Sequence, residues 1–170
     1  MIRLYGAKFT EKEKGRETAR RLLAFAVSHA WGWAEVPQQE RGTWGKPFFP
    51  VPHSEFRFNL SHTEGLALCA LSDEGEVGVD IEVVKPRKEG LPRYVMSEEE
   101  FAAFDGTWED FTRIWTLKEA MVKYRGTSVA KARAIPVPPD IPYRSYEGEG
   151  WRAALCCAGE PPAEINWVEV

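Results

Sequence analysis

The chain has 170 residues, of which 44% are hydrophobic and 28% charged, and its net charge is −4. This length supports one substantial core or two small ones and falls short of two ordinary domains. The acidic balance excludes the overall basic character of a nucleic-acid binder, and the apolar runs are too short to span a bilayer or to form a signal peptide. We therefore expect a globular, cytoplasmic protein with neither a nucleic-acid nor a membrane partner.

The first half of the chain alternates between strand-like and helical patterns. It predicts a strand over 2–7 and a helix over 17–31 whose inward side chains are Ala19, Leu22, Leu23, Phe25, Ala26 and Ala30. Residues 37–53 are rich in proline and glycine, which predicts a loop. Two strand-like runs follow at 66–71 and 76–84, and the connecting SDEG favours a hairpin.

The second half begins after a break, KPRKEGLP, near residues 85–92. Ser97 and Glu100 have the spacing of a capping box at the start of a short helix, and a longer helix over 108–125 ends at Gly126. Strand candidates follow at 141–147, 151–158 and 165–170. Because each half offers a similar amount of helix and sheet, the order suggests two related α/β lobes.

Cysteine usage indicates no metal or disulfide framework. Cys69, Cys156 and Cys157 lack CxxC spacing and lie in apolar, strand-like runs. We expect buried, reduced thiols.

The stretch GVDIE (78–82) places two carboxylates on one face of a strand. Side chains alternate along a strand, so Asp80 and Glu82 share a face while Val79 and Ile81 point into the core. Two adjacent carboxylates repel unless a cation lies between them, and oxygen-only ligands favour a hard ion such as Mg²⁺. The alternative is a solvated edge strand with alternating acids.

A third acid lies in the helix WTLKEAMVKYRG. Glu119 falls at the border of an apolar stripe formed by Phe111, Ile114, Trp115 and Val122. Lys118 and Lys123 flank it, so one helix presents a carboxylate and two ammonium groups. The alternative is an ordinary Glu–Lys helix pair.

Further polar residues suit phosphate binding. FNLSHTEG (58–65) places Ser61 and His62 between strand-like segments, in a predicted loop, and GKP (45–47) adds Lys46. A basic cluster near the N-terminus comprises Lys12, Lys14, Arg16, Arg20 and Arg21. Together with the acids, these residues describe a site for a magnesium-bound polyphosphate. The chain contains neither a P-loop sequence nor the kinase motifs.

The order GKP, FNLSHTEG, GVDIE and WTLKEAMVKYRG, over residues 45–126, resembles the signatures of the Sfp-like 4′-phosphopantetheinyl transferases. The resemblance implies transfer of the 4′-phosphopantetheine arm of coenzyme A to a serine of an apo acyl or peptidyl carrier protein, with release of 3′,5′-ADP. It also implies a monomer with two similar α/β lobes, each a small antiparallel sheet packed with a long helix, and coenzyme A between them. We expect the lobes to span 1–86 and 87–170.

Carried over residue by residue, the resemblance assigns a metal centre. Asp80, Glu82 and Glu119 would hold Mg²⁺ against the pyrophosphate of coenzyme A. Lys123 would neutralise phosphate charge, with Lys118 nearby. This places the predicted divalent ion and two ammonium groups where charge develops on the leaving group.

The resemblance assigns the remaining contacts to coenzyme A and to proton transfer. Ser61 and His62 would contact its phosphates, and Lys46 would lie near the 3′-phosphate. The family's arginine before the first long helix is matched by Arg16, with Arg20 and Arg21 as rivals. The general base that accepts the serine proton aligns with Glu100, for which Glu98 and Glu99 compete.

One departure from the family concerns the N-terminal region, which is shorter here. Either Lys12, Lys14 and Arg16 replace the family's basic residues, or the 3′-phosphate is held more weakly. A non-catalytic coenzyme A or carrier-protein binding module remains an alternative, as does a different Mg²⁺-dependent phosphotransferase.

Overall fold

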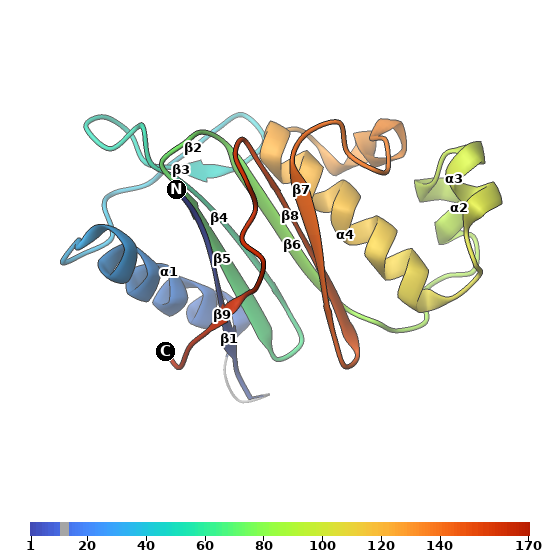
Figure 1. The fold of residues 1–170 in the computed structure, drawn as a ribbon, viewed down its shortest axis with the longest axis horizontal. Helices are drawn as coiled ribbons and strands as arrows, with labels where there is room; N and C mark the ends of the chain where they lie inside the picture. The colour runs from blue at the N-terminus through green and yellow to red at the C-terminus, as the bar shows by residue number, and fades with distance from the viewer. Residues whose placement is uncertain (11–13) are drawn as a thin grey trace.

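The computed structural model describes residues 1–10 and 14–170 and shows a mixed α and β fold with two main sheets, a two-stranded pair and two long helices (Figure 1). The first sheet has the strand order β4 (Arg57–Thr63), β5 (Leu66–Ser72), β1 (Ile2–Lys8), β9 (Asn166–Trp167). Its strands are antiparallel except that β9 runs parallel to β1. The second sheet is antiparallel, in the order β6 (Val77–Val83), β8 (Trp151–Cys157), β7 (Tyr143–Gly148).

The remaining elements are helices and one very short strand pair. The helical elements are α1 (Gly15–Trp31), α2 (Leu91–Val95), α3 (Glu98–Ala103), α4 (Trp108–Arg125) and the 3₁₀ turn η1 (Val129–Ala134). The strand pair consists of β2 (Glu40–Arg41) and β3 (Pro47–Phe48). Among the helices of the described residues, none is both long and apolar enough to cross a membrane.

The predicted limits of the second long helix are confirmed by its caps. Thr107 accepts a hydrogen bond from the Asp110 N–H at the start of α4, and Gly126 ends the helix with φ of 61°. The capping box of Ser97 and Glu100 is also present at the start of α3. These ends form locally, which explains why the sequence indicates them.

The predicted hairpin between 66–71 and 76–84 is wrong. β5 pairs with β1 and β4, whereas β6 crosses to the other sheet and pairs with β8. The segment 58–65, predicted as a loop, is mostly strand β4. The division at residue 86 stays a prediction, although strand pairing crosses it, since β6 precedes residue 86 and joins β8, while β9 joins β1.

Apolar side chains fill the space between the sheets and beneath each long helix. Between the sheets, Val79 and Ile81 of β6 join a cluster with Leu4 and Leu68. Helix α1 packs on the other face of the first sheet, and α4 packs on the other face of the second (Figure 1). The predicted alternation in GVDIE is therefore confirmed for its apolar residues.

The predicted apolar stripe of α4 is confirmed in part. Phe111, Ile114 and Val122 are buried, but Trp115 is only half-buried and stacks on Phe111. The three cysteines are buried and free, as expected.

Gly78 brings α4 unusually close to β6. A β-carbon at this position would lie 2.2 Å from the Ala120 carbonyl oxygen and 2.3 Å from the Tyr124 amide nitrogen. Both are backbone atoms of α4, which cannot be moved by a side-chain rotation. The absent side chain of Gly78 therefore lets the helix that carries Glu119 and Lys123 lie directly on the strand that carries Asp80.

Candidate active site

Asp80 is the most buried acid of the group, with 4% of its surface exposed. Its Oδ1 accepts hydrogen bonds from Lys123 Nζ at 2.7 Å and from Ser61 Oγ at 2.9 Å. Its Oδ2 is buried and has no hydrogen-bond partner among the described residues. Buried carboxylate oxygens are normally satisfied, so this oxygen is suited to a cation.

Glu119 and Glu82 lie within electrostatic reach of Asp80. Burial, the charge of Asp80 and, more weakly, that of Glu82 together raise the pKa of Glu119 to about 7, against the opposing charge of Lys123. Burial and the charge of Asp80 likewise raise the pKa of Glu82. Three carboxylates thus share one side of β6 and α4, where a bound cation would relieve their repulsion.

Two cations of the chain already contact these acids. Lys123 bonds Asp80, and Arg87 Nη2 lies 3.0 Å from Glu82 Oε2. In the described part of the chain, no three His, Cys, Asp or Glu side chains are arranged to hold a metal as they stand. The donor types fit Mg²⁺, and the open Asp80 Oδ2 is the most suitable ligand, but Glu82 Oε2 becomes fully available to an ion only when Arg87 leaves it.

This arrangement predicts that Arg87 competes with a divalent ion for Glu82. We expect Arg87→Ala to tighten the binding of Mn²⁺ to the protein by roughly tenfold, because the substitution frees Glu82 and removes a positive charge. Electron paramagnetic resonance of free Mn²⁺ measures the affinity. The matched control is Lys88→Ala, which removes the charge of an exposed neighbour and should change the affinity by less than about twofold. Equal affinities of wild type and Arg87→Ala would contradict the competition.

Ser61 lies at the centre of the polar contacts between β4 and β6. Its hydroxyl donates to Asp80 Oδ1 and accepts from the Ile81 N–H at 3.2 Å and from Lys123 Nζ at 3.1 Å. The single hydroxyl proton is thus used by Asp80. The structure brings together the predicted residues Ser61, Asp80 and Lys123, while contact of Ser61 with a phosphate stays a prediction.

His62 and Arg16 line a cavity of about 520 Å³. Its cationic lining comprises Arg16, Arg20 and Arg41, and His62 also borders it. Burial lowers the pKa of His62, and the charges of Lys123 and Arg16 lower it further. The cavity has the charge and size for an anionic group. Arg16 and its rival Arg20 both line it, whereas Lys12 lies outside the described residues.

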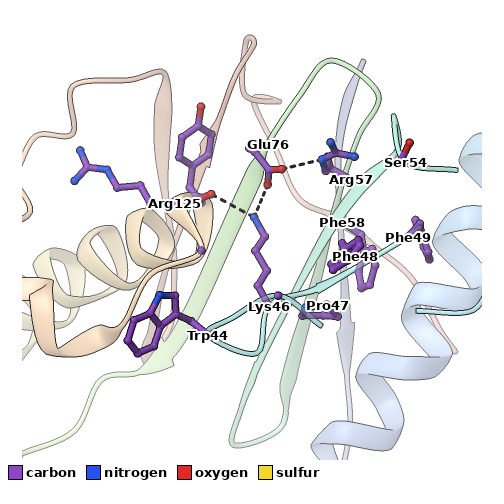
Figure 2. A pocket seen from close by; sticks show the side chains of 13 residues that line it. Trp44, Lys46, Pro47, Phe48, Phe49, Ser54, Arg57, Phe58, Glu76 and Arg125 are labelled. Carbon is purple, nitrogen blue, oxygen red and sulfur yellow. Dashed lines mark hydrogen bonds and ion pairs between the residues drawn. The ribbon is translucent and has the colours of Figure 1, made fainter. Parts of the chain in front are cut away.

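Lys46 turns toward the start of β6 (Figure 2). Its Nζ donates to Glu76 Oε2 at 2.6 Å, to the Val77 carbonyl at 3.0 Å and to the Tyr124 carbonyl at 3.3 Å. It lines a cavity of about 470 Å³ together with Trp44 and Arg125. Burial lowers the pKa of Lys46, and Glu76 opposes that effect. Contact with a 3′-phosphate stays a prediction.

Glu100 and Lys118 form a separate cluster. The Lys118 side chain is fully buried, and its Nζ lies 2.8 Å from Glu100 Oε2 and donates to the carbonyls of Ala132 and Ile135. Glu100 Oε1 accepts from the Val137 N–H. Consecutive helix residues face different directions, so Lys118 does not lie with Glu119 beside Asp80 and Glu82. Its predicted contact with phosphate therefore lacks support from this packing.

Sequence reasoning missed Arg87 and Asn59. Asn59 is buried, and its Oδ1 accepts a hydrogen bond from the Val79 N–H at 2.8 Å. Asn59 stands two residues before Ser61 on the same strand, so the period of two was a usable signal once 58–65 was taken as a strand. Arg87 lies in a charged, irregular segment that gave no such signal.

Comparison with known proteins finds a family that this chain resembles. A model of the 4′-phosphopantetheinyl transferase superfamily matches residues 76–145. This stretch contains Asp80 and Glu82 of β6 and Glu119 and Lys123 of α4. Over these residues the chain is similar to the 4′-phosphopantetheinyl transferase superfamily.

Curated relatives extend the match beyond that stretch. The chain is 46% identical over 116 residues to the 4′-phosphopantetheinyl transferase AcpT of Escherichia coli O157:H7, covering 64% of this chain and 56% of AcpT. It is 28% identical over 148 residues to 4′-phosphopantetheinyl transferase HetI of Nostoc sp., covering 81% of this chain and 61% of HetI. It is also 28% identical over 132 residues to the mouse L-aminoadipate-semialdehyde dehydrogenase-phosphopantetheinyl transferase, covering 68% and 42%. The chain thus spans little more than half the length of AcpT.

Proposed function

We propose that the protein transfers the 4′-phosphopantetheine arm of coenzyme A to a serine of an apo acyl or peptidyl carrier protein, in a Mg²⁺-dependent reaction that releases 3′,5′-ADP. The observation that carries the proposal is Asp80, a buried carboxylate with one oxygen that no described residue bonds. It lies beside Lys123 and Glu119 within the segment that matches the superfamily. The proposed arrangement is a monomer of two similar lobes, 1–86 and 87–170, with coenzyme A between them.

The proposed chemistry is displacement at the β-phosphorus of coenzyme A. The serine oxygen forms a bond to that phosphorus, the bond from phosphorus to the bridging oxygen breaks, and its electron pair leaves with 3′,5′-ADP. When bound by Asp80, Glu82 and Glu119, the divalent ion would offset the charge of the leaving group.

Lys123 would stabilise the transferred phosphate. Its Nζ now donates to Asp80, to Ser61 and to the Val79 carbonyl at 3.1 Å. An ammonium group has three protons, so contact with a phosphate oxygen requires Lys123 to exchange one of these bonds. Arg16 and His62 would receive a further phosphate in their cavity.

Glu100 is the proposed general base, with Glu98 and Glu99 as rivals. Glu98 and Glu99 are exposed, whereas Glu100 is engaged with Lys118, Val137 and its own capping box. Accepting the serine proton would require Glu100 to leave one of these partners, which makes Glu100→Gln an informative variant in the assay below.

The proposed function is tested by weighing a carrier. Incubation with coenzyme A, Mg²⁺ and an apo carrier protein should raise the carrier's mass by about 340 Da, the mass of the transferred arm. Chelation of the metal should abolish the gain. If several carriers keep their mass while calorimetry shows that coenzyme A binds, the protein is a non-catalytic binding module and the transferase proposal is wrong.

A further inference from the structure

Strand β6 forms one end of the second sheet, so one of its edges has no backbone partner strand within that sheet. Outward-facing N–H and C=O groups of such an edge are usually paired, covered or solvated. Here β4 of the other sheet runs alongside this edge (Figure 1), but the two strands share no ladder.

Side chains replace the missing ladder. Asn59 Oδ1 accepts from the Val79 N–H, and Ser61 Oγ accepts from the Ile81 N–H. The carbonyls on the same edge are bound by lysines, that of Val77 by Lys46 and that of Val79 by Lys123. We call these four side chains, Lys46, Asn59, Ser61 and Lys123, the β6 seam.

The β6 seam fixes the residue between its two amide contacts. Asp80 lies between Val79 and Ile81, and both of their N–H groups are held from β4. The position of Asp80 relative to β4 and Lys123 therefore depends on hydrogen bonds from backbone N–H groups of β6 to side chains of β4. Three members of the seam, Lys46, Ser61 and Lys123, are predicted to contact coenzyme A. Their substitution would therefore change both the position of Asp80 and the contact with substrate. Asn59 is the member without such a role, and it bonds the neighbour of Asp80 rather than Asp80 itself.

We propose that Asn59 is a positioning residue, which holds Asp80 in place by accepting the Val79 N–H, and the effect on catalysis rests on the proposed transferase function. Asn59 is buried, with 4% of its surface exposed. Its hydrogen bond of 2.8 Å is the shorter of the two that the seam accepts from backbone N–H groups of β6. Without this acceptor the Val79 N–H faces the interior unpaired, and the local strand shifts or opens to solvent.

The test uses Asn59→Leu, which keeps the branching of the side chain at Cγ and removes the acceptor. The matched control is Ser72→Ala, because Ser72 is also buried and its Oγ also accepts a backbone N–H, that of Glu74, at the far end of β5. Asn59→Asp is the second variant, since it keeps an oxygen at the same position. Hydrogen exchange of the Val79 amide is measured by nuclear magnetic resonance for each folded variant.

We expect the Val79 amide to exchange at least about tenfold faster in Asn59→Leu and to keep its protection in Asn59→Asp and Ser72→Ala. In the transfer assay, kcat of Asn59→Leu should fall about tenfold or more while KM for coenzyme A changes by less than about twofold. The control should keep both constants. Unchanged Val79 exchange, or an unchanged kcat in folded Asn59→Leu, would overturn the proposal.

Failure of the proposed function gives a different result. If wild-type protein transfers nothing to any carrier, the transferase proposal fails, and Mn²⁺ affinity then takes the place of kcat. A several-fold weaker affinity in Asn59→Leu, with faster Val79 exchange, supports the positioning role. Affinity equal to that of wild type overturns it.

Discussion

Asp80→Asn is expected to reduce transfer on the order of 100-fold or more while leaving the fold intact. Asparagine has the shape of aspartate, so the buried pocket stays filled and Ser61 keeps an acceptor. The negative charge between Lys123 and Glu119 is lost, and with it the oxygen best suited to a divalent ion. The mass gain of a carrier protein at fixed time measures the rate, and thermal unfolding measures the fold.

The control for Asp80→Asn is Asp140→Asn. Asp140 is exposed and pairs with Arg125 at 3.3 Å, a contact of little expected consequence. The control should transfer at the wild-type rate. Glu119→Ala is expected to match Asp80→Asn in its loss of transfer. Full activity in Asp80→Asn or in Glu119→Ala would exclude the proposed metal centre.

Gly78→Ala is expected to lower the free energy of unfolding by roughly 3 kcal/mol, near the upper range for overpacking. The added methyl group would meet backbone atoms of α4, and a helix backbone cannot rotate aside. For a chain of this size, the melting midpoint should fall by about 6 to 12 °C. Because α4 carries Glu119 and Lys123, its displacement should also reduce transfer in the protein that remains folded.

The control for Gly78→Ala is Gly90→Ala. A β-carbon at Gly90 has no atom within 4 Å, and this residue has a φ of −77° that alanine adopts readily. Its melting midpoint should stay within about 2 °C of wild type. If Gly78→Ala melts together with wild type, the close contact between α4 and β6 described here is incorrect.

Features that depend on near neighbours in the chain were predictable from the sequence. The capping box of Ser97 and Glu100, and the glycine that ends α4, are set by hydrogen bonds within one or two turns. The alternation of GVDIE likewise follows from strand geometry once the strand is recognised. Asp80, Lys123 and Ser61 were therefore predicted as site residues, and the structure brings them together.

Features that depend on the partner of a strand were not predictable. SDEG suits a hairpin, but β5 and β6 are both buried, and packing between two sheets decided that β6 pairs with β8. The same limit hid the β6 seam, because its hydrogen bonds join residues that are 20 to 44 positions apart in the chain. Lys118 illustrates a simpler error, since adjacency in a helix sequence does not mean a shared direction.

The central claim is that Asp80, Glu82 and Glu119 bind one divalent ion beside coenzyme A. Anomalous scattering from a crystal grown with coenzyme A and Mn²⁺ tests this most directly. We expect one strong peak within bonding distance of all three carboxylates, with Arg87 moved away from Glu82. A crystal with coenzyme A bound, but with the manganese elsewhere and Arg87 still on Glu82, would contradict the claim.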